Sequence, residues 1–316
     1  MSKDSTGEAM ATKNRVVVIG ATGNFGLVTM MEGLALGLEM VGISRGKSER
    51  NASATAKLEK SGAVMAYAAL DDEKALARAM AGADAVILMP PMSVLLTTSK
   101  AAINAAIQAG VKRVVLSPDG IDPGVHGKDS TGVLGMKREI KDMVIAAGME
   151  WTQVFIGGYA DWMLPTMQWD TLSSHGKGDV RIIISCAADV GAVYARASID
   201  PRTSRKAVLM ISHVGTESEA LALVGKHYPE ALKMLRNHTE EEIRERAAAG
   251  EDMAQVEALF YLDGLCDYTS PTFLKTAPSH VDAKELYPEL TFKSWEELYA
   301  DPTFFYGPKG ASQSID

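Results

Sequence analysis

Glycines at three-residue spacing, Gly20, Gly23 and Gly26, directly follow the aliphatic run Val16–Ile19. Glycines at a strand end let the backbone turn sharply and approach a pyrophosphate, whose charge the N–H groups and positive dipole of the next helix stabilise. Apolar residues then recur at helical spacing, at positions 27, 30, 31, 34 and 38. Because a strand precedes the glycines and a helix follows them, the spacing favours a dinucleotide-binding turn over a plain strand-to-helix turn. The binding candidates in this turn are Gly20, Thr22, Gly23, Asn24, Phe25 and Gly26.

The end of the second expected strand is basic. An acidic residue about 20 positions beyond the glycines normally holds the ribose of NAD. Here Ser44, Arg45 and Lys47 occupy that end, and Glu39 lies at the other end of the strand. Arginine, lysine and serine can bind a 2′-phosphate through charge-assisted hydrogen bonds. The sequence therefore favours NADP over NAD, with Arg50 as a further contact; the alternative is that Arg45 is a solvated turn residue.

Lys137 lies in a stretch of helical pattern where short-chain dehydrogenases carry a Tyr four residues before a Lys. In those enzymes the Tyr donates a proton, and the Lys holds the ribose and lowers the Tyr pKa. The position four residues before Lys137 is Val133, which has no proton to donate. The usual tyrosine mechanism is therefore excluded at this position.

The ends of the fourth and fifth expected strands supply further candidates. Met89, Pro90 and Pro91 follow the fourth strand and are expected to flank the cofactor, although the prolines can simply terminate the strand. Ser117 follows the fifth strand, where dehydrogenases of this class place a serine that orients the substrate.

A glycine-rich loop, Gly120–Gly132, follows Ser117 and can fold over the nicotinamide. Asp119 and His126 are substrate-site candidates here, and Asp129 lies in the same loop. His126 can act as an acid near neutral pH, but a lone loop histidine can equally be solvated.

Large polarizable side chains follow the sixth expected strand. Gly157 and Gly158 would allow a planar ring to approach the backbone, and Tyr159, Trp162 and Met163 would form walls around an aromatic substrate. Ordinary core packing between two lobes explains the same residues equally well.

These residues need a sheet whose strands end together. From Arg15 to Phe155, short β-branched runs alternate with amphipathic helical stretches, which indicates a doubly wound parallel α/β sheet of the Rossmann type. Ligands bind such sheets at the carboxyl ends of the strands. The expected strands are 16–19, 39–44, 63–66, 85–89, 113–116 and 151–155, with helices after Asn24, Asn51, Asp72, Ser93 and Thr131.

The chain changes character after Gly157. We expect strands at 180–184 and 207–211, a helix at 188–198, and several helices over 217–262. This organisation predicts a flexible tail (1–14), a nucleotide-binding domain (15–156) and a smaller, helix-rich substrate lobe (157–316) partly interleaved with it.

Composition narrows the class of protein. Of 316 residues, 47% are hydrophobic and 23% charged, and the net charge of −8 argues against a nucleic-acid surface, which needs concentrated Lys and Arg. Cys186 and Cys266 show no metal-ligand spacing, so we expect two buried thiols and no metal site. The polar N-terminus resembles no signal peptide, and no run of about 18 apolar residues predicts a membrane span. We therefore expect a cytoplasmic monomer or homodimer that acts on a small molecule.

Several segments together resemble the NmrA-like, or isoflavone-reductase-like, atypical short-chain dehydrogenases, in particular the phenylcoumaran benzylic ether reductase branch. The resemblance covers nearly the whole chain, and its carriers are 20–26, 81–87, 110–115, Lys137 with 148–152, 281–290 and 295–298. In that family the Tyr is commonly absent and a Lys at the position of Lys137 is regarded as catalytic or as a nicotinamide-ribose anchor. The resemblance therefore makes Lys137 the best catalytic candidate and a cofactor contact.

Two functions of different classes remain. The first is an NADPH-dependent reductase that transfers hydride to a small aromatic molecule, at a carbonyl, enone, quinone or benzylic ether. The second is a sensor that binds NADP or NAD and acts through a protein partner; a purely structural NADP is a third possibility. Lys137 and the reductase-like C-terminal segments favour the enzyme. The fold and the cofactor site alone do not discriminate these functions.

Overall fold

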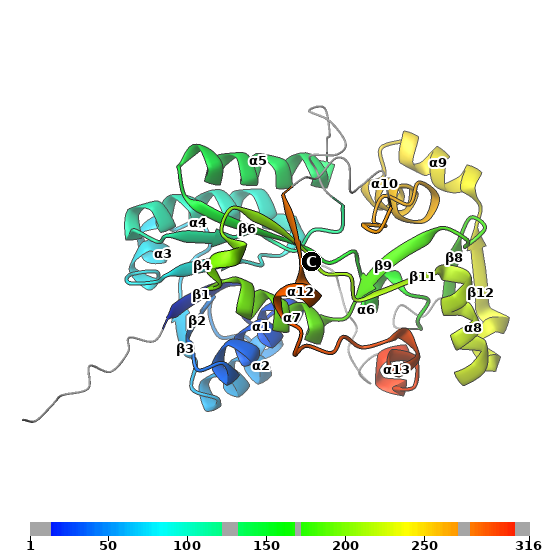
Figure 1. Ribbon diagram of the computed structural model, residues 1–316, viewed down its shortest axis with the longest axis horizontal. Coiled ribbons are helices and arrows are strands. Elements are labelled where there is room, and N and C mark those ends of the chain that lie inside the picture. Colours follow the sequence, from blue (N-terminus) through cyan, green and yellow to red (C-terminus); the bar gives the residue numbers. More distant parts are fainter. Residues whose placement is uncertain (1–13, 122–131, 168–171, 271–278, 307–316) are drawn as a thin grey trace, which may run out of the picture.

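The strands expected from the sequence form the centre of a parallel sheet in the computed structural model, which describes residues 14–121, 132–167, 172–270 and 279–306 (Figure 1). Within these residues the largest sheet has eight strands in the order β13-β10-β6-β5-β4-β1-β2-β3, and all of its pairs are parallel. The strands are β1 (Arg15–Ile19), β2 (Glu39–Ser44), β3 (Val64–Tyr67), β4 (Ala85–Leu88), β5 (Arg113–Val115), β6 (Glu150–Phe155), β10 (Lys206–Leu209) and β13 (His280–Asp282). The Rossmann-type fold is confirmed, but the sheet is larger than the six strands that we expected.

Helices cover both faces of this sheet (Figure 1). One face carries α1 (Asn24–Ala35), α2 (Glu49–Lys60) and α7 (Ala187–Ala197), and the other carries α3 (Glu73–Ala79), α4 (Leu95–Ala109) and α5 (Gly132–Ala146). Alternate residues of β1 contribute to the two cores: Val16 and Val18 pack with α1 and α7, and Val17 and Ile19 pack with α3 and α4. Burial on both faces explains why this strand is continuously apolar.

The order in which strands are added to the sheet reverses at β1. The chain runs outward from β1 through β2 to β3, and then crosses back so that β4 pairs with the other side of β1. Helices that leave β1 and β4 therefore diverge to opposite faces and leave a crevice at the carboxyl ends of these strands. The glycine turn follows β1 and lies at this crevice.

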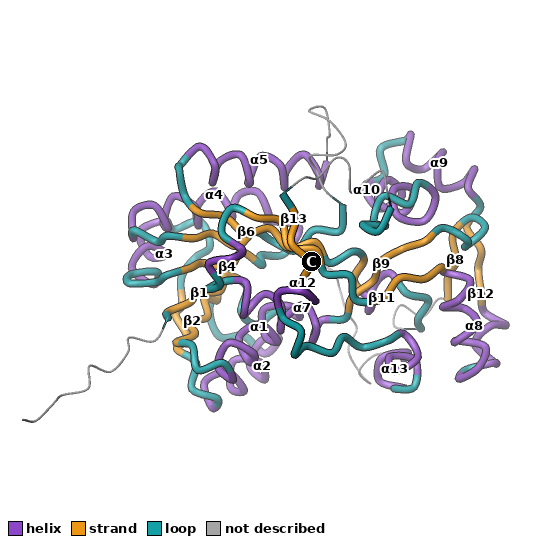
Figure 2. The backbone as a smooth tube through the Cα atoms, in the orientation of Figure 1, coloured by secondary structure: helices purple, strands orange, loops and turns teal. Residues whose placement is uncertain are grey.

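The second half of the chain contributes strands to the main sheet and also forms the two small sheets beside it (Figure 2). β10 and β13 extend the main sheet beyond β6, and α7 packs against α1. Two small sheets lie outside the main one, in the orders β11-β9-β7 and β12-β8. Their strands are β7 (Gly158–Tyr159), β8 (Leu172–His175), β9 (Arg181–Ser185), β11 (His213–Thr216) and β12 (Leu235–His238).

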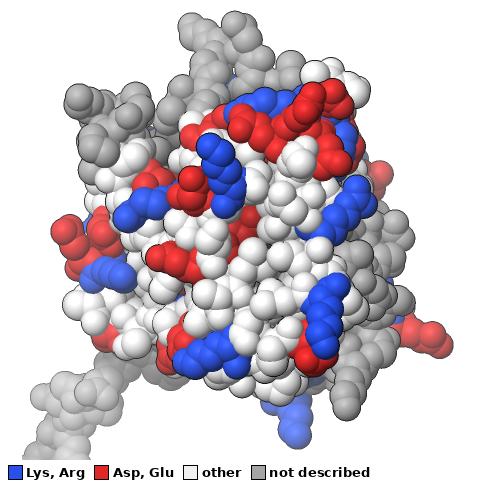
Figure 3. All heavy atoms as spheres, turned by 90° about the vertical axis from the view of Figure 1, so that its right-hand side faces the viewer, with Lys and Arg blue, Asp and Glu red and all other residues white. Residues whose placement is uncertain are grey.

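The region 217–262 contains the several helices that we expected, and also the short strand β12. The helices of the second half are α6 (Ala160–Met163), α8 (Glu217–His227), α9 (Glu240–Ala248), α10 (Asp252–Glu257), α12 (Ala283–Leu286), α13 (Trp295–Tyr299) and α14 (Pro302–Tyr306). On the face formed by this half, acidic and basic side chains alternate (Figure 3) and pair, as Arg244 does with Glu240 at 2.8 Å.

Two expectations about composition can also be compared with the structure. Cys186 and Cys266 are free and buried, as expected for structural thiols. Among the described helices, none is both long enough and apolar enough to cross a membrane.

Candidate functional site

The turn after β1 requires glycine at two positions because the backbone approaches itself closely. Gly20 has a φ of +82°, and a Cβ there would lie 2.0 Å from the carbonyl oxygen of Met89. A Cβ on Gly26 would lie 2.1 Å from the carbonyl oxygen of Gly20. Gly23 donates its N–H to that same oxygen at 3.0 Å and precedes α1 without a side-chain cap. The first N–H groups of α1 are therefore available to an anion.

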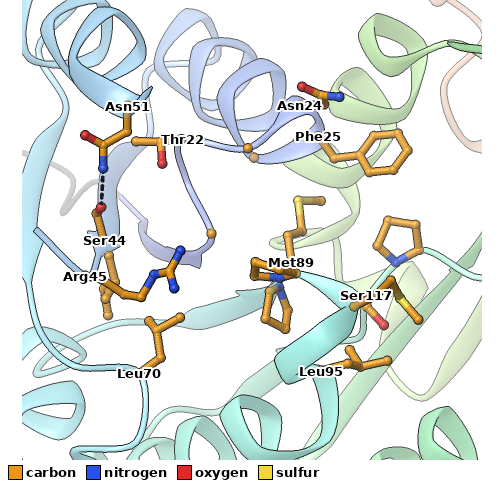
Figure 4. Close-up of a pocket in the computed structure, with 18 of the residues that line it drawn as sticks. Thr22, Asn24, Phe25, Ser44, Arg45, Asn51, Leu70, Met89, Leu95 and Ser117 are labelled. Atoms are coloured by element: carbon orange, nitrogen blue, oxygen red, sulfur yellow. Dashed lines mark hydrogen bonds between the residues drawn. The ribbon is translucent and has the colours of Figure 1, made fainter. Parts of the chain in front are cut away.

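A cavity of about 690 Å³ opens at this turn and extends across the ends of β2, β4 and β5 (Figure 4). Residues that the sequence predicted as cofactor contacts make up much of its lining: Gly20, Thr22, Gly23, Asn24, Phe25, Gly26, Ser44, Arg45, Met89, Pro90, Pro91, Ser117 and Lys137. Met92 and Pro118, which continue the predicted segments after β4 and β5, also line it; the sequence analysis missed Ile43, Ser48, Asn51, Leu70 and Leu95. In Figure 4, Met89 lies between a group around Arg45 and a group around Ser117.

The end of the cavity near β2 is polar and basic. Asn51 donates its amide to the Ser44 hydroxyl at 3.2 Å and to the carbonyl oxygen of Gly46 at 2.8 Å. Its side-chain oxygen accepts from the N–H of Ser48 at 2.8 Å, so one amide ties the turn after β2 to the start of α2. Asn51 carries no charge, and the sequence marked it only as the expected start of a helix, which in the structure begins at Glu49. The guanidinium of Arg45 faces this end of the cavity (Figure 4).

Lys47, also predicted as a cofactor contact, lies outside the cavity lining. Its ammonium is 3.3 Å from a carboxylate oxygen of Glu59 and 5.8 Å from the ring centroid of Tyr67. The side chain is 65% exposed. The basic residues of this turn are therefore divided between the cavity, through Arg45, and the outer surface.

The opposite end of the cavity contains Lys137, which α5 brings to the end of β5. Its ammonium donates to the carbonyl oxygen of Pro118 and lies 2.8 Å from a carboxylate oxygen of Asp119. The side chains of Lys137 and Asp119 are only 12% and 2% exposed. Asp119 therefore lies behind the lysine, and its expected contact with the substrate is corrected to a contact with Lys137.

Tyr159 also lines the cavity and packs its ring against Phe25, with centroids 4.6 Å apart. Burial, and next the charge of Asp161, raise the pKa of the Tyr159 phenol above its ordinary value. Hydrogen bonds join the phenol to Asp161 and to Asn24. Since the phenol holds its proton tightly, Tyr159 is suited to contact and orientation and is a poor replacement for the missing tyrosine acid.

The other predicted substrate contacts are placed differently. Met163 is 6% exposed and packs in the core of the second half, whereas Trp162 is 39% exposed; neither lines the cavity. A Cβ on Gly157 would lie 2.1 Å from the carbonyl oxygen of Ile183, so this glycine serves contact with β9 and not with a planar ligand.

His126, Asp129 and most of the Gly120–Gly132 loop lie outside the described residues. Among the residues that the structure describes, no group of three or more His, Cys, Asp or Glu side chains could hold a metal ion.

Comparison with known proteins identifies the family. The model of the NmrA-like family matches residues 12–299. The chain is 25% identical over 313 residues to a phenylcoumaran benzylic ether reductase of Pinus taeda, covering 92% of this chain and 99% of the relative. It is 26% identical to one of Betula pendula, covering 91% and 98%. Among solved structures, the leucoanthocyanidin reductase–NADPH complex of Vitis vinifera has the same fold, with a TM-score of 0.79 at 22% identity, covering 91% of this chain and 98% of that one.

Proposed function

The chain belongs to the NmrA-like family, and we propose that it is an NADPH-dependent reductase of small aromatic molecules. One observation carries this proposal: the glycine turn, Arg45 and Lys137 line a single cavity. The cavity therefore combines groups suited to a pyrophosphate, a 2′-phosphate and a reacting oxygen. Relatives named as reductases match the chain along nearly their whole length, which supports an enzyme over a sensor.

The residues present are suited to NADPH. The glycine backbone and the first N–H groups of α1 would hold the pyrophosphate, because a Cβ at Gly20 or Gly26 would displace the backbone that forms the cradle. Ser44 and Arg45 would hold the 2′-phosphate. When bound, the cofactor supplies hydride. The side chains at the other end of the cavity then determine which substrate can accept this hydride.

At that end Lys137 supplies the proton chemistry. An ammonium has three N–H donors, and those of Lys137 contact Pro118, Asp119 and the cavity that the side chain lines. It would donate a hydrogen bond or a proton to an oxygen that becomes negative as the neighbouring carbon is reduced. Met92, Leu95 and Tyr159 add apolar and aromatic surface for a ring. A carbonyl, enone, quinone or benzylic ether next to an aryl group meets these requirements.

Steady-state consumption of NADPH with a panel of quinones, enones, aryl ketones and benzylic ethers tests the proposal. We expect turnover with at least one class, and a loss of at least about 100-fold in kcat for Lys137→Met. The dissociation constant for NADPH should stay within about tenfold, since the glycine turn and Arg45 are unchanged. Lys100→Met is the control, because Lys100 pairs with Glu139 at the surface at 2.6 Å.

Two outcomes would contradict the proposal in different ways. Near-normal turnover of Lys137→Met would refute the role of the lysine. Tight NADPH binding without consumption across the whole panel would instead indicate a sensor of the cofactor.

A further inference from the structure

A row of polar side chains lies behind Lys137. The Lys137 ammonium is 2.8 Å from Asp119 Oδ1, and Gln153 donates its amide to Asp119 Oδ2 at 2.6 Å. Lys141 in turn donates to Gln153 Oε1 at 2.5 Å. Asp119 is 2% exposed and Gln153 is 1% exposed, so water cannot substitute for these contacts. The order Lys137, Asp119, Gln153, Lys141 therefore forms one connected network.

The backbone holds Asp119 independently of its side chain. Asp119 bridges to Phe155 at the end of β6, where its N–H donates to Val154 O at 3.1 Å and its carbonyl accepts from Ile156 N–H at 2.8 Å. Gln153 lies on the same strand β6. The backbone of Asp119 is thus held against β6 of the main sheet, while the lysine that its carboxylate contacts comes from α5.

Donor and acceptor chemistry fixes the direction of each hydrogen bond. An ammonium only donates and a carboxylate only accepts, so the Gln153 amide must turn its oxygen to Lys141 and its nitrogen to Asp119. Reversing the amide would face oxygen to carboxylate and nitrogen to ammonium. Lys141, which also lies over the ring of Trp151 at 4.6 Å, therefore locks the glutamine. The locked glutamine in turn orients the carboxylate.

This arrangement is a poor way to stabilise a fold. Burial of an ion pair removes both charges from water, and well-packed apolar residues of similar volume are often as stable or more stable. Here the buried carboxylate of Asp119 contacts the Lys137 ammonium at the edge of the cavity, and the buried amide of Gln153 contacts that carboxylate. The Lys137 ammonium donates to the Pro118 carbonyl oxygen and forms an ion pair with Asp119, and the same side chain lines the cavity.

We propose that Asp119, oriented by Gln153, is a positioning residue that holds Lys137 in place for the reduction. This inference rests on the proposed function. Asp119 does not touch the substrate in this arrangement; it provides the counter-charge that holds the Lys137 head group at the cavity edge.

The test uses Asp119→Asn in the full chain, because this change removes the charge and retains the shape. We expect kcat to fall by about 10- to 100-fold with the NADPH dissociation constant within about threefold. A merely structural defect would weaken NADPH binding as well as lower kcat.

Two further variants keep the test decisive. Gln153→Met removes the amide and keeps the charge, so we expect a smaller loss in kcat, and this variant replaces Asp119→Asn if the latter fails to fold. Asp142→Asn is the matched control, since the Asp142 side chain is 67% exposed on α5, the helix that carries Lys137, and this change should leave kcat and the NADPH dissociation constant unchanged.

The two proposals fail in distinguishable ways. If Lys137→Met is inactive while Asp119→Asn and Gln153→Met have normal kcat, the positioning role is overturned and the reductase stands. If Lys137→Met retains turnover, the proposed role of the lysine has failed, whatever the Asp119 variants show.

Discussion

Replacement of Arg45 by Ala is expected to weaken the binding of NADPH while leaving the binding of NADH almost unchanged. Arg45 lines the cavity beside Ser44, and the Asn51 amide holds the turn that carries both residues. An exposed ion pair contributes up to about 1 kcal/mol, and a hydrogen bond to a charged group about 1.5–3 kcal/mol. Arg45 is exposed but lies at a formed pocket, so we take about 2 kcal/mol for its contact with a 2′-phosphate. At about 1.4 kcal/mol per factor of ten, the NADPH dissociation constant should rise by about 30-fold.

The assay compares NADPH and NADH by titration of intrinsic fluorescence or by calorimetry. NADH lacks the phosphate, so its dissociation constant should change by less than about twofold in Arg45→Ala. Lys47→Ala is the matched control: its ammonium lies 3.3 Å from Glu59 and outside the cavity, so the affinity for NADPH should change by less than about threefold. Equal losses for the two cofactors, or a loss in Lys47→Ala as large as in Arg45→Ala, would refute the assignment of Arg45 to the phosphate.

Gly26→Ala should weaken NADPH binding by more than about tenfold and lower the melting temperature, because its Cβ would lie 2.1 Å from the rigid carbonyl oxygen of Gly20. Gly225→Ala is its control: the nearest atom is a Leu232 methyl group at 3.2 Å, so cofactor affinity should be unchanged in a titration of both variants. Burial lowers the pKa of His213, so the unfolded chain takes up this proton at higher pH than the folded chain does. Stability from the neutral imidazole is present above pH of about 6.5 and is lost as pH falls through the folded pKa. Melting temperatures should therefore drop less between pH about 7.5 and about 5.5 in His213→Gln than in the parent, and an equal drop would contradict this reasoning.

Local sequence patterns were sufficient for the first part of the main sheet. The strands from β1 to β6 were expected within a residue or so of their observed bounds. Burial on both faces makes central strands such as β1 and β4 compact apolar runs. The sequence could not show that β10 and β13 join the same sheet. β13 has three residues, all half-buried, and pairs with β10 more than 70 positions earlier in the chain. Such pairings depend on tertiary contacts that a local pattern does not contain.

The glycine turn and Arg45 could also be predicted from the sequence. Their roles depend on a property of the single residue, which is the missing Cβ of glycine or the positive charge of arginine. Asn51 could not be predicted in this way, because its role consists of hydrogen bonds to Ser44, Gly46 and Ser48 that exist only once α2 begins beside β2. Nothing in the residue type marks an asparagine in the first turn of a helix as part of a phosphate site.

For Asp119 the sequence named the residue but predicted a different contact from the one observed. Its position after a strand and beside a glycine-rich loop made it a candidate for contact with the substrate. The partner comes from α5, and the second hydrogen bond comes from β6. A buried carboxylate that pairs with Lys137 and accepts from Gln153 is poorly placed to bind a substrate group, but it is well placed to hold the ammonium of Lys137. The chemistry of this site is therefore determined by which element lies behind the lysine as much as by the lysine itself.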